Sequence, residues 1–471
     1  MAGATSDGGL HRLSCSDADK IVRDWFAKEV VTIDSKVKYF VDKMGSQWAI
    51  FPGENNDIPP IAVGSHLDSV QTGGRFDGPL GVFTGLEVAR VITAAKASGK
   101  GMYAPLAVIN WTNEEGARFP PGCMSSAVWS GEMTLEDAHK CTDTTDQSIT
   151  IGHELKRIGY LGDVEAFHET NPLSAHFEIH IEQGSRLEKA GKEVGIVESS
   201  QGMRWYNASL KGFTRHTDTT FMDDRRDALV GAAKCVLEIQ RLGRESKTGM
   251  ATVSLFRSSP QNFCNIPGHV DFSFSMQHTD QKVLEKMEED AFAFIRSMAK
   301  EDKLDVTRLE KIWNFEPNRF DETAVRCLED AAEEMGFNYT RIGNMTGHDS
   351  VYTRLVCPTA MVFTPCKDGI SHNPAEYASP EECSTGAQVI LGGVMNFDAI
   401  VWEGVLVRVR LVVEVRARSW SSLWNESGES TSSLQNVIAM ELTQAQFYAR
   451  VESELQSFAP GRPDAEAQQG V

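Results

Sequence analysis

Two rhythms of apolar and polar residues alternate between positions 61 and 200. The short apolar runs IAVGS (61–65) and LAVIN (106–110) are typical of buried strands, whereas LGVFTGLEVARVITAAK (80–96) repeats its apolar residues at helical spacing. The segment HFEIHIEQ (176–183) alternates strictly, with its Phe and Ile residues on one face. This order predicts an α/β fold, a mostly parallel sheet with flanking helices, in which ligands gather where the strands end.

Residues 203–313 follow a different order, β-α-β-β-α-β, which is that of a ferredoxin-like α+β unit. The predicted strands are Arg204–Leu210, Ala251–Phe256, Val270–Met276 and Leu304–Ile312, and the predicted helices are Arg226–Leu242 and Gln281–Ala299. We expect this stretch to form a separate domain inserted into the first one.

Helical and apolar segments resume after the insertion, at 321–336, 358–363 and 381–396. The predicted domains are therefore a catalytic domain in two parts (1–202 and 314–400), an inserted dimerisation or lid domain (203–313) and an atypical C-terminal extension (401–471). The extension begins with alternating Val and Arg and continues in a polar stretch. Its composition favours an accessory or poorly packed segment.

Composition narrows the class of partner. The chain has 46 Lys+Arg against 66 Asp+Glu, a net charge of −20, which argues against nucleic acid and anionic membrane surfaces. It has no run of 18 apolar residues and no readable signal peptide. Nine cysteines without CxxC spacing favour reduced thiols. We therefore expect a cytoplasmic protein that acts on a small molecule.

Several polar residues that could carry chemistry follow strands or turns of the first domain. Taken singly, each has an ordinary structural explanation, such as a helix cap or a solvated loop. Together, three imidazoles and two carboxylates suit two divalent ions bridged by one carboxylate. Glu114 adds a free carboxylate of the kind that metal-assisted hydrolysis uses to move a proton. The five candidate ligands are His66, Asp77, Glu115, His180 and His372.

The alternating segment 176–183 leaves a question open. Its polar residues, His176, Glu178, His180 and Glu182, share the face opposite the apolar one. If that face is buried, each polar side chain needs a partner. The alternative is a half-exposed edge strand.

The motifs GSHLDSV, GGRFDGPLG, WTNEEGARFPPG, HIEQG, GHDSVYTR and ISHNPAEY occur in this order. Over roughly Leu10 to Asp398 the chain resembles the amidase/hydantoinase/carbamoylase family of dinuclear metallohydrolases. That family includes β-ureidopropionases, N-carbamoyl-L-amino acid hydrolases and allantoate amidohydrolases, and is related to the zinc aminoacylases. Several segments resemble fungal β-ureidopropionase-like members most.

The resemblance implies a role for individual residues. The five candidate ligands match the family's metal ligands, with Asp77 as the bridging carboxylate. Glu114 matches the general acid/base, and Asp68 matches a carboxylate behind the first histidine. His216 matches a histidine that reaches across a dimer to the other subunit's active site. The residues that match substrate contacts are Gln183 and Asn265, and His348 and Asp349 match a motif of unassigned role.

The chain departs from the family pattern at two places. The stretch HTDTTFM has Asp218 and Phe221 where the family commonly has a small residue and a proline. Gln277 stands where the family usually has the arginine that binds the substrate carboxylate, and a neutral amide cannot form the bidentate charged pair. Arg204 or Arg215 is a candidate replacement, so Gln277 and Arg204 are both candidate substrate contacts.

The resemblance therefore implies a metal-dependent hydrolase of linear amides. The expected reaction cleaves an N-carbamoyl amino acid, N-carbamoyl-β-alanine or an N-carbamoyl-L-amino acid, to the amino acid, ammonia and carbon dioxide. Two ions, Zn²⁺ or else Mn²⁺, Co²⁺ or Ni²⁺, and a homodimer through the inserted domain are also expected. The alternatives are an allantoate amidohydrolase or aminoacylase using the same site, and a relative that binds metal or ligand without turnover.

Overall fold

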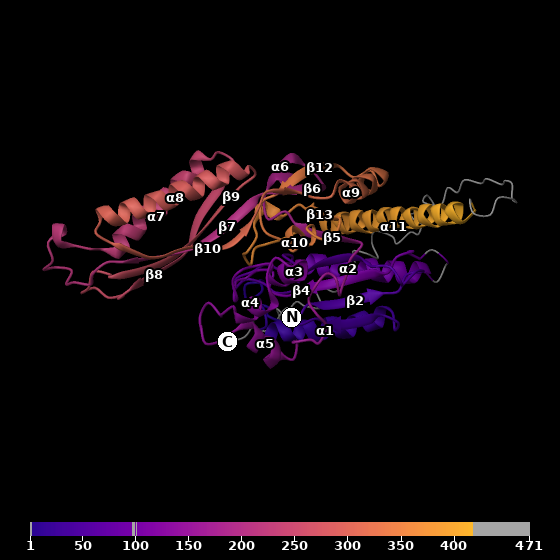
Figure 1. Cartoon of the computed structure of the whole chain (residues 1–471), viewed down its shortest axis with the longest axis horizontal. Coiled ribbons are helices and arrows are strands. Elements are labelled where there is room, and N and C mark those ends of the chain that lie inside the picture. Colours follow the sequence, from indigo (N-terminus) through magenta and orange to yellow (C-terminus); the bar gives the residue numbers. More distant parts are fainter. Residues whose placement is uncertain (1, 97–98, 100, 418–471) are drawn as a thin grey trace, which may run out of the picture. The chain divides into compact units, whose positions relative to one another are not determined.

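The computed structural model describes residues 2–96, 99 and 101–417, and its elements are labelled in Figure 1. The chain divides into two compact units. Among the described residues, the first comprises residues 2–198, 320–342 and 348–417, and the second comprises residues 199–319 with 343–347. The expected inserted domain, 203–313, falls inside the second unit.

The first unit is built on a mixed sheet with the strand order β1-β2-β4-β3-β5-β13-β6, and β12 also pairs with β6. The central strands β4, β3, β5 and β13 are parallel, whereas β1, β2 and β6 pair antiparallel at the two edges. The predicted α/β fold is confirmed, and its parallel part is the centre of the sheet. The strands are β1 (Lys38–Val41), β2 (Gln47–Phe51), β3 (Ile61–His66), β4 (Leu106–Trp111), β5 (Ala175–Ile181), β6 (Val194–Ser200), β12 (Tyr339–Asn344) and β13 (Thr359–Thr364).

Helices flank this sheet, and several of them begin directly after a polar N-cap residue. Ser16 caps the first helix by accepting a hydrogen bond from the Asp19 amide, and Asp321 caps α9 through the Ala324 amide. The helices of the unit are α1 (Asp17–Ile33), α2 (Pro79–Lys96), α3 (Met124–Ser130), α4 (Leu135–Lys140), α5 (Ile151–Ile158), α6 (Arg186–Ala190), α9 (Glu322–Glu334), α10 (Ser350–Thr353) and α11 (Pro380–Ala417), with a 3₁₀ turn η2 at Lys367–Gly369.

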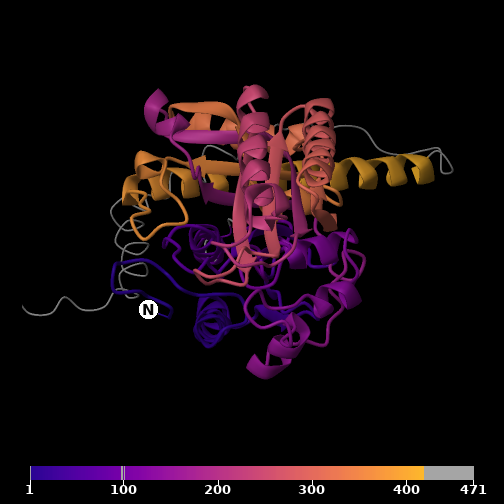
Figure 2. The ribbon, with the colours of Figure 1, turned by 90° about the vertical axis from the view of Figure 1, so that its left-hand side faces the viewer.

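Helix α11 is one continuous helix of 38 residues, drawn in yellow in Figure 2. The predicted extension from residue 401 therefore begins inside this helix, and its residues 418–471 lie outside the described part of the chain. Among the described residues, no helix combines the length and the apolar character that crossing a membrane requires.

Strand β5 is buried at all seven positions and lies between β3 and β13, which excludes the half-exposed edge strand. Its polar face therefore needs partners inside the protein, and it has them. Glu178 accepts hydrogen bonds from Ser65 Oγ at 3.0 Å and Ser350 Oγ at 2.7 Å, and His176 Nε2 accepts one from Trp111 Nε1 at 3.3 Å. The polar face of this central strand is thus an internal surface of the first unit.

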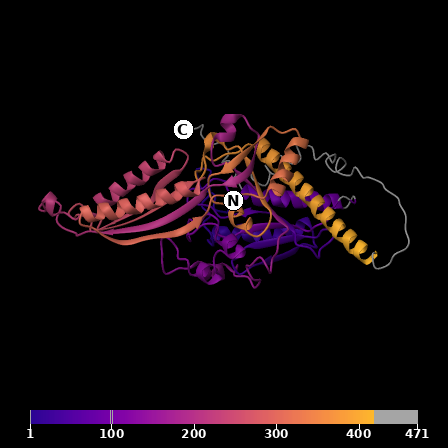
Figure 3. The same ribbon diagram turned by 45° about the horizontal axis from the view of Figure 1, so that its top comes forward.

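The second unit confirms the predicted β-α-β-β-α-β order, with a four-stranded antiparallel sheet in the order β10-β7-β9-β8. Helices α7 and α8 pack against each other and cover one face of this sheet (Figure 3). This is the ferredoxin-like arrangement. Its elements are β7 (Gly202–Lys211), η1 (Met222–Asp224), α7 (Ala228–Glu245), β8 (Met250–Ser259), β9 (His269–His278), α8 (Gln281–Glu301) and β10 (Asp305–Phe315), followed by the short strand β11 (Asn318–Arg319).

Candidate metal centre

The five candidate ligands meet in the first unit, where the parallel strands end. His66 is the last residue of β3, His180 lies near the end of β5, and Glu115 follows β4. Asp77 stands just before α2, and His372 lies on the loop that follows β13. Carboxyl ends of parallel strands open at one edge of a sheet, and this shared edge brings distant residues together.

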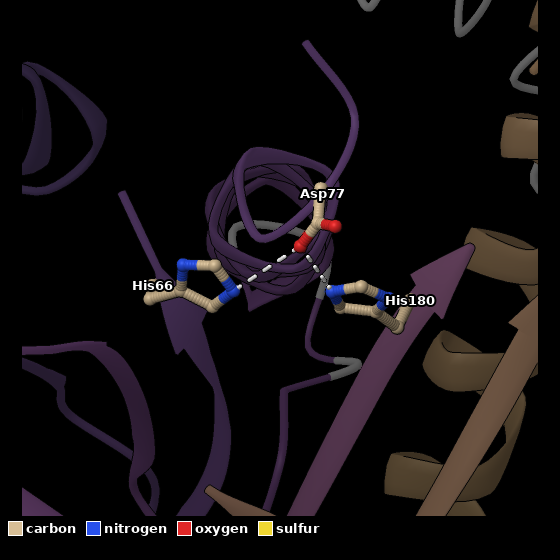
Figure 4. A group of neighbouring side chains, drawn as sticks. All are labelled: His66, Asp77 and His180. Atoms are coloured by element: carbon tan, nitrogen blue, oxygen red, sulfur yellow. Dashed lines mark ion pairs between the residues drawn. The ribbon is translucent and has the colours of Figure 1, made fainter. Parts of the chain in front are cut away.

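Asp77 and two histidines form the first group of possible ligands. Asp77 Oδ1 lies 3.6 Å from His66 Nε2 and 3.1 Å from His180 Nε2 (Figure 4). All three side chains are buried, and their ligand atoms lie within 4.8 Å of one another. A single cation could therefore contact all three.

The other carboxylate oxygen of Asp77 belongs to a second group. Asp77 Oδ2 lies 3.3 Å from His372 Nε2, which is also 3.3 Å from Glu115 Oε2. The His372 side chain is 49% exposed, so this group opens toward solvent. Asp77 is shared by both groups and presents one oxygen to each.

Hydrogen bonds to backbone carbonyls orient the buried histidines. His66 Nδ1 lies 3.0 Å from the Asp68 carbonyl oxygen, and His180 Nδ1 lies 2.9 Å from the Ile181 carbonyl oxygen. A carbonyl can only accept, so Nδ1 carries a proton in both rings and Nε2 is the nitrogen directed at Asp77. Such support of a ligand by its other ring nitrogen is usual at metal sites.

Asp68, the expected carboxylate behind His66, lies beside the Nδ1 side of that ring. Its carbonyl oxygen supports the His66 ring, whereas its carboxylate lies 3.8 Å from His66 Nδ1. That carboxylate accepts hydrogen bonds of 3.3 Å from the backbone amides of Glu114 and Glu115. Asp68 therefore links the loop after β3 to the loop after β4.

The charges of the site favour a cation. Burial lowers the pKa of His180, but the charge of Asp77, the hydrogen bond to it and the charge of Glu178 together outweigh burial and raise the pKa to about 9. Conversely, burial would raise the pKa of Asp77, but His180 and His372 hold it well below its usual value. Two buried atoms, His66 Nε2 and Glu115 Oε1, have no hydrogen-bond partner. Buried polar atoms left without partners are costly, and a divalent ion in each group would satisfy them.

Glu114 points to a different part of the same site from its neighbour. Its Oε2 lies 3.4 Å from His66 Nε2, and its Oε1 accepts a hydrogen bond from Cys123 Sγ at 3.4 Å and lies 3.9 Å from His348 Nδ1. Burial, together with the charges of Asp349 and Glu115, raises the pKa of Glu114 well above its usual value. This carboxylate can therefore hold or release a proton beside the two ligand groups.

Comparison of the sequence with known proteins identifies the family of the chain. A family model described as peptidase family M20/M25/M40 matches residues 62–396. The chain belongs to this family. Within it, an N-carbamoyl-L-amino-acid amidohydrolase of Rhizobium meliloti is 36% identical over 402 residues, which cover 84% of this chain and 92% of the relative. An allantoate amidohydrolase of Bacillus subtilis is 28% identical over 394 residues, covering 82% of this chain and 92% of that protein.

A solved structure agrees with the sequence relatives. The crystal structure of an amidase of the hydantoinase/carbamoylase family from Burkholderia vietnamiensis is 39% identical, with a TM-score of 0.80, and the match covers 84% of this chain and 93% of that one. The expected resemblance to the amidase/hydantoinase/carbamoylase family is therefore confirmed. Membership in peptidase family M20/M25/M40 also agrees with the α/β fold of the first unit.

Gln183, an expected substrate contact, lies beside Asp77 in the candidate metal centre of this M20/M25/M40 protein. Its backbone has a φ of 55°, in the left-handed region, and its Nε2 donates a 2.7 Å hydrogen bond to Asp77 Oδ2. Its Oε1 is buried without a hydrogen-bond partner. The side chain thus has an acceptor free inside the site.

In the second unit the structure brings together two of the residues that the resemblance singled out. His216 and Asn265 form an isolated antiparallel bridge, and Thr217 and Ile266 add backbone hydrogen bonds between the same two loops. The His216 side chain is exposed, and its Nδ1 accepts a 3.1 Å hydrogen bond from the Asp218 amide.

Gln277 and Arg204 lie in the sheet of the same unit. Gln277 is half-buried on β9. Arg204 is buried, and its guanidinium donates to Glu288 at 2.6 Å and to Asn314 at 3.0 Å. The charge of Arg204 is thus paired with Glu288 inside this unit, and its Nη2 lies 3.8 Å from Glu316 Oε1.

The sequence did not reveal one residue that contacts both the loop of Asp77 and the loop of His372. Glu376 is buried, and its carboxylate accepts hydrogen bonds from the amides of Phe76 and Asp77 and from Ser371 Oγ. The only signal was its place four residues after His372 in ISHNPAEY. An acidic residue in a loop motif does not by itself reveal a partner about 300 residues away.

Proposed function

We propose that this M20/M25/M40 protein is a metal-dependent amidohydrolase that cleaves the C–N bond of N-carbamoyl amino acids. The observation that carries the proposal is the arrangement around Asp77, one carboxylate shared by two ligand groups, with the Glu114 carboxylate beside them. The relative named N-carbamoyl-L-amino-acid amidohydrolase, at 36% identity over most of both chains, supports the substrate class.

Two divalent ions would be held by the two groups. His66, Asp77 and His180 would bind one ion, and Asp77, Glu115 and His372 the other. Imidazole and carboxylate ligands suit Zn²⁺, which we propose as the resident metal, and also Mn²⁺, Co²⁺ and Ni²⁺. When bound, such ions polarise a carbonyl and lower the pKa of water from 15.7 to about 7.

Glu114 would move the protons of the reaction. Hydrolysis adds water across the bond between the carbamoyl carbon and the amino-acid nitrogen, and the resulting carbamate releases ammonia and carbon dioxide. Glu114 is suited to accept a proton from water and to pass it to the leaving nitrogen, because its carboxylate faces the ligand groups and the environment favours its protonated form. The reaction yields the free amino acid, one ammonia and one carbon dioxide.

His216 would complete the site of a second subunit, as the resemblance implies. The Asp218 amide donates to Nδ1, so in the neutral ring the proton lies on Nε2. That N–H is exposed and can donate to the oxygen that gains negative charge on the substrate. Asn265, bridged to His216, and Gln183 and Gln277 would contact the rest of the substrate.

This role of His216 requires a homodimer, which we propose forms through the second unit. Strand β8 is the terminal strand of its sheet, and its apolar side chains Leu255 and Phe256 are 41% and 39% exposed. On the adjacent helix α7, Leu237 is 67% exposed. An edge strand presents unpaired backbone groups, and its exposed apolar side chains favour burial. Pairing with the same strand of a second copy would satisfy both. A cytosolic location agrees with the nine cysteines, all of which are free thiols.

A second candidate function is allantoate amidohydrolase. The 28% identity to the allantoate amidohydrolase of Bacillus subtilis favours it, since the match covers most of both proteins. The residues of the centre would act in the same way, because allantoate also carries ureido groups whose C–N bonds are hydrolysed.

The deciding experiment uses protein reconstituted with Zn²⁺ and measures ammonia release from the ureido substrates and acetate release from the N-acetyl-amino acids. The substrates are N-carbamoyl-β-alanine, N-carbamoyl-L-amino acids, allantoate and N-acetyl-amino acids. Highest kcat/KM on an N-carbamoyl amino acid supports the proposal, whereas highest kcat/KM on allantoate or an acyl-amino acid replaces it with that activity. Two bound ions without turnover of any substrate would support a binding protein instead.

A further inference from the structure

The carboxylate of Glu376 connects the two loops that carry Asp77 and His372. Its Oε1 accepts hydrogen bonds from the Phe76 amide at 2.9 Å and the Asp77 amide at 3.0 Å. Its Oε2 accepts a 3.0 Å hydrogen bond from Ser371 Oγ, which also lies 2.8 Å from Asp77 Oδ2. Ser371 directly precedes His372, so one buried carboxylate restrains the backbone of both loops.

The Glu376 side chain packs directly against the backbone of Gly74. Glu376 is 2% exposed, and a methyl group placed on Gly74 would lie 2.0 Å from Glu376 Cδ. No side chain can therefore stand at position 74 while Glu376 keeps its place. A buried carboxylate is stable only when its oxygens are hydrogen-bonded, and here both oxygens are.

The two ligand groups differ in how firmly their histidines are held. His66 and His180 lie on the central strands β3 and β5, and their rings are hydrogen-bonded to backbone carbonyls. His372 lies on a loop, has a φ of 54° and is half exposed. The second group therefore depends more on loop contacts than the first does.

We propose that Glu376 is a positioning residue that holds Asp77 and the His372 loop in place, so that Asp77 can serve both ligand groups. This inference rests on the proposed function, because it takes the two groups as metal sites. Without the Glu376 carboxylate, the Asp77 amide and Ser371 lose their common acceptor. The group of Asp77, Glu115 and His372 then weakens more than the group on the strands.

The test is Zn²⁺ binding by full-length Glu376→Ala, measured by competition with a chelator and by metal content after dialysis. We expect the weaker of two sites to lose affinity by roughly 10–100-fold, the usual effect of removing a residue that orients a ligand. The stronger site should change much less. In Glu376→Gln, the amide oxygen can still accept both backbone hydrogen bonds, so this conservative variant should restore two-ion binding.

Asp398 provides a matched control. It is also a buried carboxylate in the first unit, and it accepts hydrogen bonds of 2.8 Å from two consecutive amides, those of Tyr103 and Ala104. Asp398→Ala removes the same kind of contact without touching either loop of the centre. It should lower the thermal unfolding temperature and leave both Zn²⁺ affinities unchanged.

Equal Zn²⁺ affinities in wild type and Glu376→Ala, at both sites, would overturn the inference. If Glu376→Ala does not fold, Ser371→Ala removes the hydrogen bonds of Ser371 to Glu376 and to Asp77. Unchanged affinities in that variant would overturn the inference equally. Failure of the proposed function alone is recognised separately, because wild-type protein would then bind two ions but hydrolyse none of the substrates.

Discussion

Gln277 and Arg204 lie on opposite faces of the four-stranded sheet, although their strands are paired. In the register of β7 and β9, Arg204 stands opposite Met276, and Gln277 stands opposite Met203. Directly opposed residues share a face, and successive residues alternate. Arg204 is thus on the face of the buried Met276, covered by α7 and α8, where it pairs with Glu288. Its guanidinium therefore lies on the face of the sheet opposite to the side chain at position 277.

Restoring an arginine at position 277 should strengthen binding of acidic substrates. A charged hydrogen bond to a carboxylate contributes about 1.5–3 kcal/mol, and about 1.4 kcal/mol is a factor of ten in affinity. Gln277→Arg should therefore lower KM for N-carbamoyl-β-alanine by roughly tenfold or more. An uncharged carbamoyl amine serves as control, and its KM should not improve. Equal effects on both compounds would show that residue 277 does not face the carboxylate.

Removing the shared carboxylate should affect both metal sites. Asp77→Ala takes one ligand from each group, so we expect the protein to lose both ions on dialysis. His372→Ala takes a ligand from the second group only, so one ion should remain. Metal content by atomic emission, with activity before and after re-addition of Zn²⁺, checks both variants. Two ions in Asp77→Ala would refute the shared-ligand arrangement.

Substitutions of the two adjacent glutamates, Glu114 and Glu115, should have different effects, one on kcat and the other on metal binding. Glu114→Gln keeps the shape of the side chain but cannot accept a proton, so both ions should remain while kcat falls by roughly 10²–10⁴-fold. Glu115→Gln should instead weaken metal binding, because Glu115 contacts His372 in the second group. The opposite pattern would mean that the two roles are exchanged.

Mixing two inactive variants tests whether His216 acts across a dimer. A heterodimer of Glu114→Gln and His216→Ala has one site with Glu114 from one chain and His216 from the other. Random reassortment gives half heterodimers with one intact site each, so activity should return to about a quarter of wild type. If His216 serves its own subunit, no mixed dimer has an intact site. Activity would then not return, and refolding of each variant alone sets the baseline.

Acid should destabilise the protein partly through His176. Burial lowers the pKa of His176 to about 3, so below pH 6.5 the unfolded chain binds a proton that the folded chain does not. The contribution of His176 to the free energy of unfolding is fully present above pH 6.5 and decreases as the pH falls toward 3. Between pH 6.5 and 5.0 wild type should lose roughly 1.5 kcal/mol more than His176→Gln. Urea unfolding with chelator present measures this, and parallel pH curves would contradict it.

Much of the fold could be predicted from the sequence because local patterns report local structure. The apolar runs at 61–65 and 106–110 became β3 and β4, and the helical spacing at 80–96 became α2. The order of patterns in 203–313 matched a ferredoxin-like unit, since each amphipathic segment must cover its neighbour. The two antiparallel edges of the first sheet were not foreseen, because pairing of edge strands depends on contacts between distant segments.

The sequence by itself determined the residue types of the centre and their places after strands, and its ordered motifs determined the family. Only the tertiary structure decided that the polar face of β5 is buried, that Asp77 offers one oxygen to each ligand group, and that Glu376 joins the two loops. It also placed Arg204 away from Gln277. The physical reason is the same in each case. A pattern along the chain reports which way a side chain points, but its charge partners and its burial depend on segments that meet only when the sheet assembles.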